Sequence, residues 1–371
     1  MKLILFFLII LTIPFVMAGG STTISGCANM GSDDYIYTQT QDIINAASCM
    51  AIGGNNITYD MNGYKIDGDD GAGDIGVRLY GDFDNNTIKN GIIKDFGFGV
   101  YLRTFSGTPN NNLINNITFD SNPIGFRLES APNNIINNSL FLGNNGIGVY
   151  SVTGDYTDNL SIYNTVFNQG TSISFGSPES GPFHLYNVSI NNSDISSGAW
   201  SRKVKPALYK YWKYNPIINN SCGEDVSANV NAYNNSGSLI KSSITKAVWL
   251  LEFWMNGTSD NLIPEFHYQN NYTINATNSS YFPLTKSLNL TIEENLNDNL
   301  LFDEPNLNFM NNLNCSCSWN WKTNQNINQN ITFQNTGTQI INANWTFGIG
   351  NQLAIPTNCK LAVSNDGGLL I

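Results

Sequence analysis

The chain has 371 residues with 17 Lys and Arg against 28 Asp and Glu, a formal net charge of −11 at pH 7. This acidic balance argues against a nucleic-acid backbone or an anionic membrane surface as partner. The chain is longer than a domain with a single hydrophobic core usually is, so two or three domains are expected. Its 59 asparagines and 33 glycines favour turns over helices, which predicts an all-β protein.

The N-terminus has the composition of an export signal. Lys2 precedes an apolar run over residues 3–16, and Ala18 is a small residue suited to cleavage, so residues 1–18 are predicted to be a signal peptide. The alternative is an uncleaved anchor. No later segment is apolar and long enough to span a bilayer as a helix. We therefore predict a secreted or cell-surface protein.

An even number of cysteines agrees with export, because disulfides form in oxidising compartments. Cys27 and Cys49 bracket the start of the repeats described below, and we expect them to form the disulfide of a cap over the open end of the core. Pairing among the other four stays open. Cys359 is expected to bond either Cys315 or Cys317.

The chain contains an internal repeat of about two dozen residues. Glycines at 76, 99, 125 and 148 each lie in a short alternating segment, such as Ile75–Leu79 or Ile124–Leu128. A single unit cannot bury its apolar face, but copies stacked about 4.8 Å apart bury those faces as one column. The repeat therefore predicts a right-handed parallel β-helix over residues 19–198.

Asparagines mark a second register in the same repeat. An inward asparagine at a corner can bond its own turn and the amide of the next coil, as a ladder. We expect this structural role, with turn preference alone as the alternative. The positions are Asn90, Asn116, Asn138, Asn164 and Asn187.

The segment Asn56–Gly68, which reads N-I-T-Y-D-M-N-G-Y-K-I-D-G, resembles the opening turn of surface and periplasmic right-handed parallel β-helix proteins. This group includes pectate-lyase-like proteins and the β-helix domain of the copper-site maturation protein NosD. The resemblance covers residues 27 to about 195. It implies the fold and says little about activity, because this fold carries lyases, hydrolases, adhesins and inert stalks alike.

After Asp194 the repeat stops and the composition changes. Short segments separated by turns predict an antiparallel β-sandwich over 199–304, which resembles carboxypeptidase-regulatory-like or Ig-like modules. Residues 305–371 are predicted to form a small β module, an incomplete sandwich, and Ile331–Gly337 resembles a segment of adhesion-type modules. The chain also has 17 N-x-S/T sequons, which predict glycosylation at the exposed ones.

The candidate ligand-binding wall is the outward row beside the repeat glycines. Tyrosines interleaved with arginines suit sugars and anionic groups. The alternatives are a solvated outer wall and a catalytic face. Catalysis is disfavoured because no histidine or lysine joins the row and the arginines are staggered. The residues are Arg78, Tyr80, Tyr101, Arg103, Arg127, Glu129 and Tyr150.

The acidic run Asp67–Asp70 with Asp74 offers hard oxygen ligands for calcium, with a solvated loop as the favoured alternative. We expect no structural metal and no cofactor. The predicted function is a non-enzymatic structural or binding protein for an extracellular polysaccharide, a cell-surface glycan or another partner. The alternative is a polysaccharide lyase or glycoside hydrolase acting on the β-helix wall.

Overall fold

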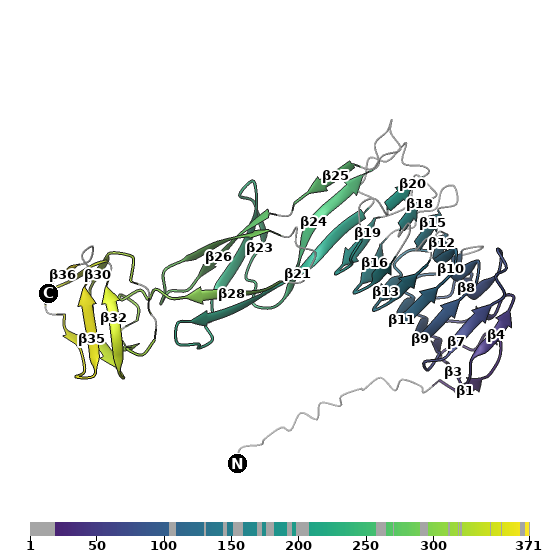
Figure 1. Cartoon of the computed structure of the whole chain (residues 1–371), viewed down its shortest axis with the longest axis horizontal. Helices are drawn as coiled ribbons and strands as arrows, with labels where there is room; N and C mark the ends of the chain where they lie inside the picture. Colours follow the sequence, from purple (N-terminus) through teal and green to yellow (C-terminus); the bar gives the residue numbers. More distant parts are fainter. Residues whose placement is uncertain are drawn as a thin grey trace, which may run out of the picture. The chain divides into compact units, whose positions relative to one another are not determined.

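The computed structural model (Figure 1) describes residues 19–103, 109–129, 131–143, 147–150, 159–168, 173–175, 182–190, 195–197, 208–256, 265–269, 271–289, 296–310, 312–317, 319, 321–341, 343–349, 351–363 and 368–370. The predicted signal peptide lies outside these residues. The chain forms two compact units, 1–181 with 190–199 and 182–189 with 200–371. The described residues contain no helix long and apolar enough to cross a membrane.

The first unit is a parallel β-helix, which confirms the predicted solenoid; its handedness stays a prediction. One sheet follows the order β1 (Ser21–Ile24), β3 (Ile36–Gln39), β6 (Thr58–Asp60), β9 (Thr87–Lys94), β11 (Leu113–Asp120), β13 (Ile135–Asn137) and β16 (Leu160–Tyr163). The strands β4 (Ile43–Ala46), β7 (Lys65–Gly68), β14 (Leu140–Leu142) and β17 (Val166–Asn168) also belong to this sheet. The second sheet follows the order β2 (Asn29–Met30), β5 (Met50–Ile52), β8 (Ile75–Tyr80), β10 (Phe98–Arg103), β12 (Ile124–Glu129), β15 (Ile147–Tyr150), β18 (Ile173–Phe175) and β20 (Ile195–Ser197).

The repeat glycines Gly76 and Gly99 lie where the backbones of adjacent coils are close together. Register places Val77, Val100 and Phe126 in one buried column, with a glycine one residue before each. A Cβ on Gly76 would lie 2.6 Å from the carbonyl oxygen of Gly99, and a Cβ on Gly99 would lie 2.5 Å from that of Gly125. Glycine recurs there because any side chain would collide with the next coil.

The predicted asparagine ladder lies on the outside of the coil, so its inward placement is wrong. All five asparagines have left-handed backbone, with φ from 47° at Asn164 to 60° at Asn90. Asparagine tolerates that conformation, which explains its recurrence at this corner. Asn116 donates its amide to Asn90 Oδ1 (3.0 Å), but Asn116, Asn138 and Asn164 are exposed, and Asn90 and Asn187 are half-buried.

A different asparagine column is buried. Asn86, Asn112 and Asn134 are each at most 1% exposed. The backbone N–H of Asn86 donates to Asn112 Oδ1, and that of Asn112 donates to Asn134 Oδ1, both at 2.9 Å. Asn112 Nδ2 also donates to the carbonyl of Phe83 (3.2 Å). This column satisfies the backbone at a corner where no strand pairing does so.

The described residues form three disulfides. Cys27–Cys49 forms at the start of the β-helix, as predicted. Cys315 bonds Cys359, one of the two pairings left open, and Cys222 bonds Cys317 across 95 residues of sequence.

The second unit begins as a mixed sheet. The long strand β21 (Leu208–Asn220) pairs in parallel with β19 (Phe183–Tyr186) and β28 (Leu296–Phe302), and antiparallel with β24 (Val248–Asn256), which pairs with β25 (Glu265–Tyr268). A small antiparallel sheet follows the order β23 (Leu239–Lys241), β22 (Asn229–Asn234), β26 (Asn271–Thr277) and β27 (Leu284–Asn289). The predicted sandwich is therefore represented by one small antiparallel sheet beside a mixed one.

Residues after 305 form parallel coils, so the expected small sandwich is wrong. One set of strands is β29 (Asn312–Asn314), β31 (Ile331–Gln334) and β34 (Leu353–Ala354). The others are β30 (Gln325–Ile327), β33 (Asn344–Phe347) and β36 (Gly368–Leu370), with β32 (Gly337–Ile341) on β35 (Cys359–Val363). All their pairings are parallel, with partners such as Asn312 and Thr332 about one coil apart in sequence.

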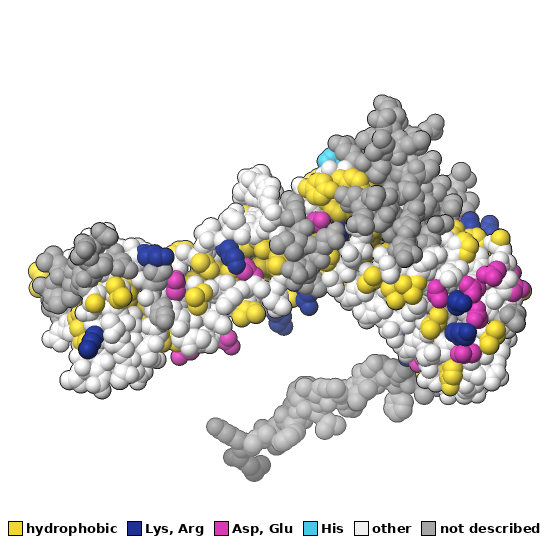
Figure 2. Space-filling model, in the orientation of Figure 1, with side chains coloured by type: hydrophobic (Ala, Val, Ile, Leu, Met, Phe, Trp, Pro, Cys, Tyr) yellow, Lys and Arg dark blue, Asp and Glu magenta, His cyan; other side chains and the backbone are white. Residues whose placement is uncertain are grey.

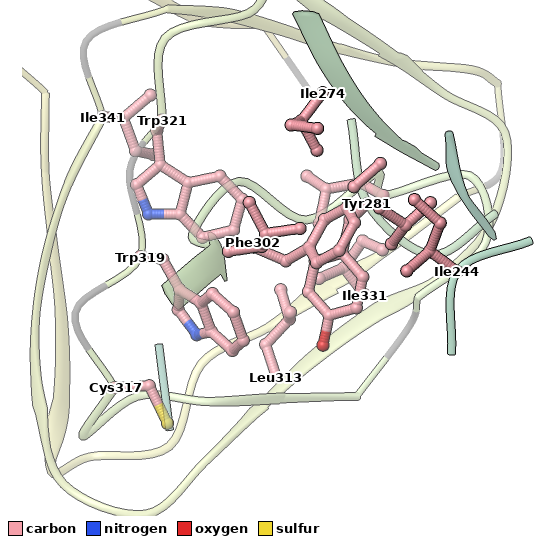
Figure 3. Close-up of a cluster of buried hydrophobic side chains, with 14 of the residues drawn as sticks. Ile244, Ile274, Tyr281, Phe302, Leu313, Cys317, Trp319, Trp321, Ile331 and Ile341 are labelled. Carbon is pink, nitrogen blue, oxygen red and sulfur yellow. The ribbon is translucent and has the colours of Figure 1, made fainter. Parts of the chain in front are cut away.

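A single hydrophobic core contains residues from the two sheets and from the C-terminal coils of the second unit. Figure 3 shows Ile274, Tyr281 and Phe302 in one buried cluster with Trp319 and Trp321 of the C-terminal coils. The centroids of the Tyr281 and Trp319 rings lie 6.3 Å apart. The Cys222–Cys317 disulfide links the same two regions covalently.

Candidate functional site

The β8, β10 and β12 strands bring the predicted wall residues together in two outward columns. Arg78 lies opposite Tyr101, which lies opposite Arg127. Arg103 lies between Tyr80 and Glu129 in the neighbouring column. The backbone of Tyr150 continues that second column beside Glu129, and its side chain lies outside the described structure. We call these seven residues the arginine wall.

The carboxylate of Glu129 contacts two of the three arginines of the wall, Arg103 and Arg127. Its side chain is 8% exposed, and its Oε2 lies 2.9 Å from Arg103 Nε. Arg127 Nη2 donates to Oε1 of the same carboxylate. Burial, together with a hydrogen bond to Glu129, raises the pKa of Tyr101, so this hydroxyl stays protonated at neutral pH. The carboxylate is thus engaged by its neighbours on the wall.

The guanidinium of Arg127 is covered by aromatic rings. Its Cζ lies 4.7 Å from the Phe98 ring centroid and 4.8 Å from that of Tyr101. Tyr80 packs edge-on against Tyr101, with centroids 5.3 Å apart. Cation–π contacts of this kind stabilise a partly desolvated charge. Arg127 is therefore a packing residue of the wall.

Arg78 differs from the other two arginines. Its side chain is exposed, and its Cζ lies 5.9 Å from the Tyr80 ring centroid. Among the described residues no carboxylate forms a salt bridge with it. It borders a hollow of about 240 Å³, whose other lining residues are Cys27, Ala28, Asn29, Ser48, Cys49 and Met50. An exposed guanidinium beside a polar hollow can bind a carboxylate, sulfate or phosphate group.

The charges on β7 and β9 and just after β9 are paired. Figure 2 shows Lys or Arg side chains interspersed with Asp or Glu side chains over the β-helix. Lys65 pairs with Asp67 and Lys94 with Asp95, both at 2.8 Å. The arginine wall, by contrast, has a formal charge of +2 and holds three of the four arginines in the sequence.

The acidic run next to β7 forms no cation site within the described residues, where no three acidic, histidine or cysteine side chains converge. Desolvation and a hydrogen bond with Asp69 raise the pKa of Asp74. The backbone N–H of Gly71 donates to Asp69 Oδ1 (3.2 Å). These contacts describe a turn between coils.

Sequence reasoning missed three contributors to this region. Phe98, Asn29 and Ser48 complete the ring contacts and the hollow. Phe98 could have been found, since it occupies the strand position of Ile75 and Ile124 in the repeat. Asn29 and Ser48 precede the clear repeats and have no sequence signal. No known family model matches the chain, and no curated protein matches it.

Proposed function

We propose that this protein is a secreted or cell-surface, non-enzymatic module protein whose arginine wall binds an anionic glycan or a similarly charged partner. The β-helix serves as a rigid support. The antiparallel sheet of β22, β23, β26 and β27 acts as a spacer, in the manner of Ig-like or carboxypeptidase-regulatory-like modules. The predicted signal peptide and the disulfides support the extracellular location.

One observation carries the binding role. The wall has a formal charge of +2 on a chain of −11, and Arg78 is exposed beside a polar hollow. Local positive potential on an acidic protein concentrates anionic ligands at that place. Tyr80 beside Arg78 offers a ring for contact with a sugar.

The alternative, a lyase or hydrolase on this wall, has less support. Glycoside hydrolysis ordinarily uses two carboxyl groups on opposite sides of the scissile bond. The arginine wall contains one carboxyl group, Glu129, and both of its oxygens contact arginines of the wall. The second carboxyl group that this reaction needs is not among the residues of the wall.

Binding to immobilised alginate and dextran sulfate, with neutral dextran as reference, tests the proposal. We expect binding to the two anionic polymers that weakens as salt rises. Arg78→Ala should reduce affinity about 10- to 100-fold, since a hydrogen bond to a charged group contributes about 1.5–3 kcal/mol. Lys360→Ala removes an exposed cation of the second unit and is the matched control. Equal affinity of the Arg78 and Lys360 variants, or equal binding to dextran, would refute the role.

A further inference from the structure

A lysine and a glutamate are buried together in the mixed sheet of the second unit. The side chains of Lys210 on β21 and Glu252 on β24 are 1% and 8% exposed. Lys210 Nζ lies 3.2 Å from Glu252 Oε2. The Nζ atom also lies 5.0 Å from the ring centroid of Trp212 and 5.6 Å from that of Phe253. Both charged groups therefore meet in mainly aromatic surroundings.

A β-bulge brings Glu252 to this place. Lys210 pairs with Phe253 and the next residue, Tyr211, pairs with Leu251, so Glu252 is the extra residue on β24. Consequently the consecutive residues Glu252 and Phe253 are both buried, although side chains on a regular strand alternate. Bulges re-aim side chains in this way, and they are over-represented next to reactive sites.

The indole of Trp212 completes the arrangement. Its Nε1–H donates to Glu252 Oε2 at 2.5 Å. A fixed donor on a carbonyl oxygen stabilises the negative charge that develops there when a nucleophile attacks. An uncharged lysine amine in apolar surroundings is a nucleophile.

We propose that Lys210 and Glu252 form an intramolecular isopeptide bond. The ammonium passes a proton to the carboxylate, which gives a neutral amine and a carboxylic acid. Nζ attacks Cδ, with Oε2 held by the Trp212 indole. The Cδ–Oε1 bond then breaks, and Oε1 leaves as water with the carboxyl proton and one amine proton. The product is an amide that joins β21 to β24, formed without oxidant or cofactor.

The bond would have a mechanical role distinct from the binding role proposed above. β21 is the strand on which β19, β24 and β28 all pair. An amide at its bulge would hold β24 in place under tension or after local unfolding. The inference rests on the buried pair alone, so it stands or fails independently of the arginine wall.

Intact mass spectrometry of the reduced protein, with peptide mapping, tests the bond. We expect the wild type to be lighter than its sequence by one water, with the tryptic peptides of Lys210 and Glu252 joined. Lys210→Arg should have the full mass of its sequence. Glu252→Gln should reach the same final mass as the wild type, because ammonia leaves in place of water.

Lys213→Arg, an exposed lysine on the same strand, is the matched control and should keep the missing water. Full sequence mass in a wild type that is folded, with its three disulfides formed before reduction, would overturn the proposal. So would a missing water that persists in Lys210→Arg, since dehydration of an aspartate elsewhere would then be its source. If Lys210→Arg fails to fold, the peptide map of Glu252→Gln decides alone.

Discussion

Replacing Asn112 with Leu tests how the β-helix satisfies its buried corner. Asn112 is 1% exposed, and its Oδ1 accepts from the backbone N–H of Asn86. Its Nδ2 donates to the carbonyl of Phe83. Leucine would remove the partner of the buried Asn86 N–H and of the partly buried Phe83 carbonyl, and each unsatisfied group costs about 1–3 kcal/mol. We expect the free energy of unfolding to fall by about 3 kcal/mol, since the two costs are partly offset by leucine burial.

The matched control is Asn116→Gly. Asn116 is exposed and has φ 56°, which glycine adopts without strain, so the change should be within about 0.5 kcal/mol. Urea unfolding followed by circular dichroism measures both variants. Because coils of a solenoid can unfold separately, hydrogen exchange at the amides of 86 and 112 provides the local readout. Equal destabilisation by the two variants would refute the buried column.

Three further predictions concern other features. Gly99→Ala should lower the melting temperature of the β-helix more than Gly73→Ala, because a Cβ at Gly99 would lie 2.5 Å from the carbonyl oxygen of Gly125, whereas a Cβ at Gly73 would meet no atom within 4 Å. Burial lowers the pKa of His184 below its ordinary value of 6.5, so the unfolded chain binds more protons than the folded chain near that pH. The free energy of unfolding should therefore fall as the pH drops through about 6.5. In thermal melts at several pH values, His184→Phe should reduce this dependence of stability on pH. Replacing Cys222 and Cys317 together by Ser should cost the second unit about 4–5 kcal/mol in denaturant, given the 95-residue separation.

The β-helix could be predicted because its repeat has a direct physical cause. Glycines at 76, 99 and 125 recur where a side chain would collide with the backbone of the next coil or, at 125, with the ring of Phe141, and their spacing is visible in one sequence. The asparagines at 90 and 116 recur as well, but recurrence does not distinguish a left-handed backbone requirement from a buried amide. That ambiguity explains why their side chains were expected inside the coil.

The C-terminal coils could not be predicted with the same rule. Their tight contacts use different residues from coil to coil, such as Trp321 packed on Trp345, so no glycine or asparagine register stands out. Gly337 is a described glycine at which a Cβ would collide with a neighbouring backbone, 2.1 Å from the carbonyl oxygen of Cys315. Short strands separated by turns are shared by sandwiches and solenoids, and the pairing direction is absent from local sequence.

The candidate wall was predictable in composition and register, but its internal bonding was not. The stagger of Arg103 relative to Arg78 and Arg127 follows from the repeat. Which arginines share the carboxylate of Glu129 depends on side-chain directions across three strands. Only the structure shows that Arg78 is exposed and that Arg103 and Arg127 contact the carboxylate of Glu129.

The most direct test of the account is a single incubation of the protein with alginate, from which both bound polymer and newly formed chain ends are measured. A non-enzymatic binding wall predicts salt-sensitive binding that depends on Arg78, with no rise in reducing or unsaturated ends over hours. Accumulating chain ends that disappear in Glu129→Gln would contradict the account and establish catalysis on this wall.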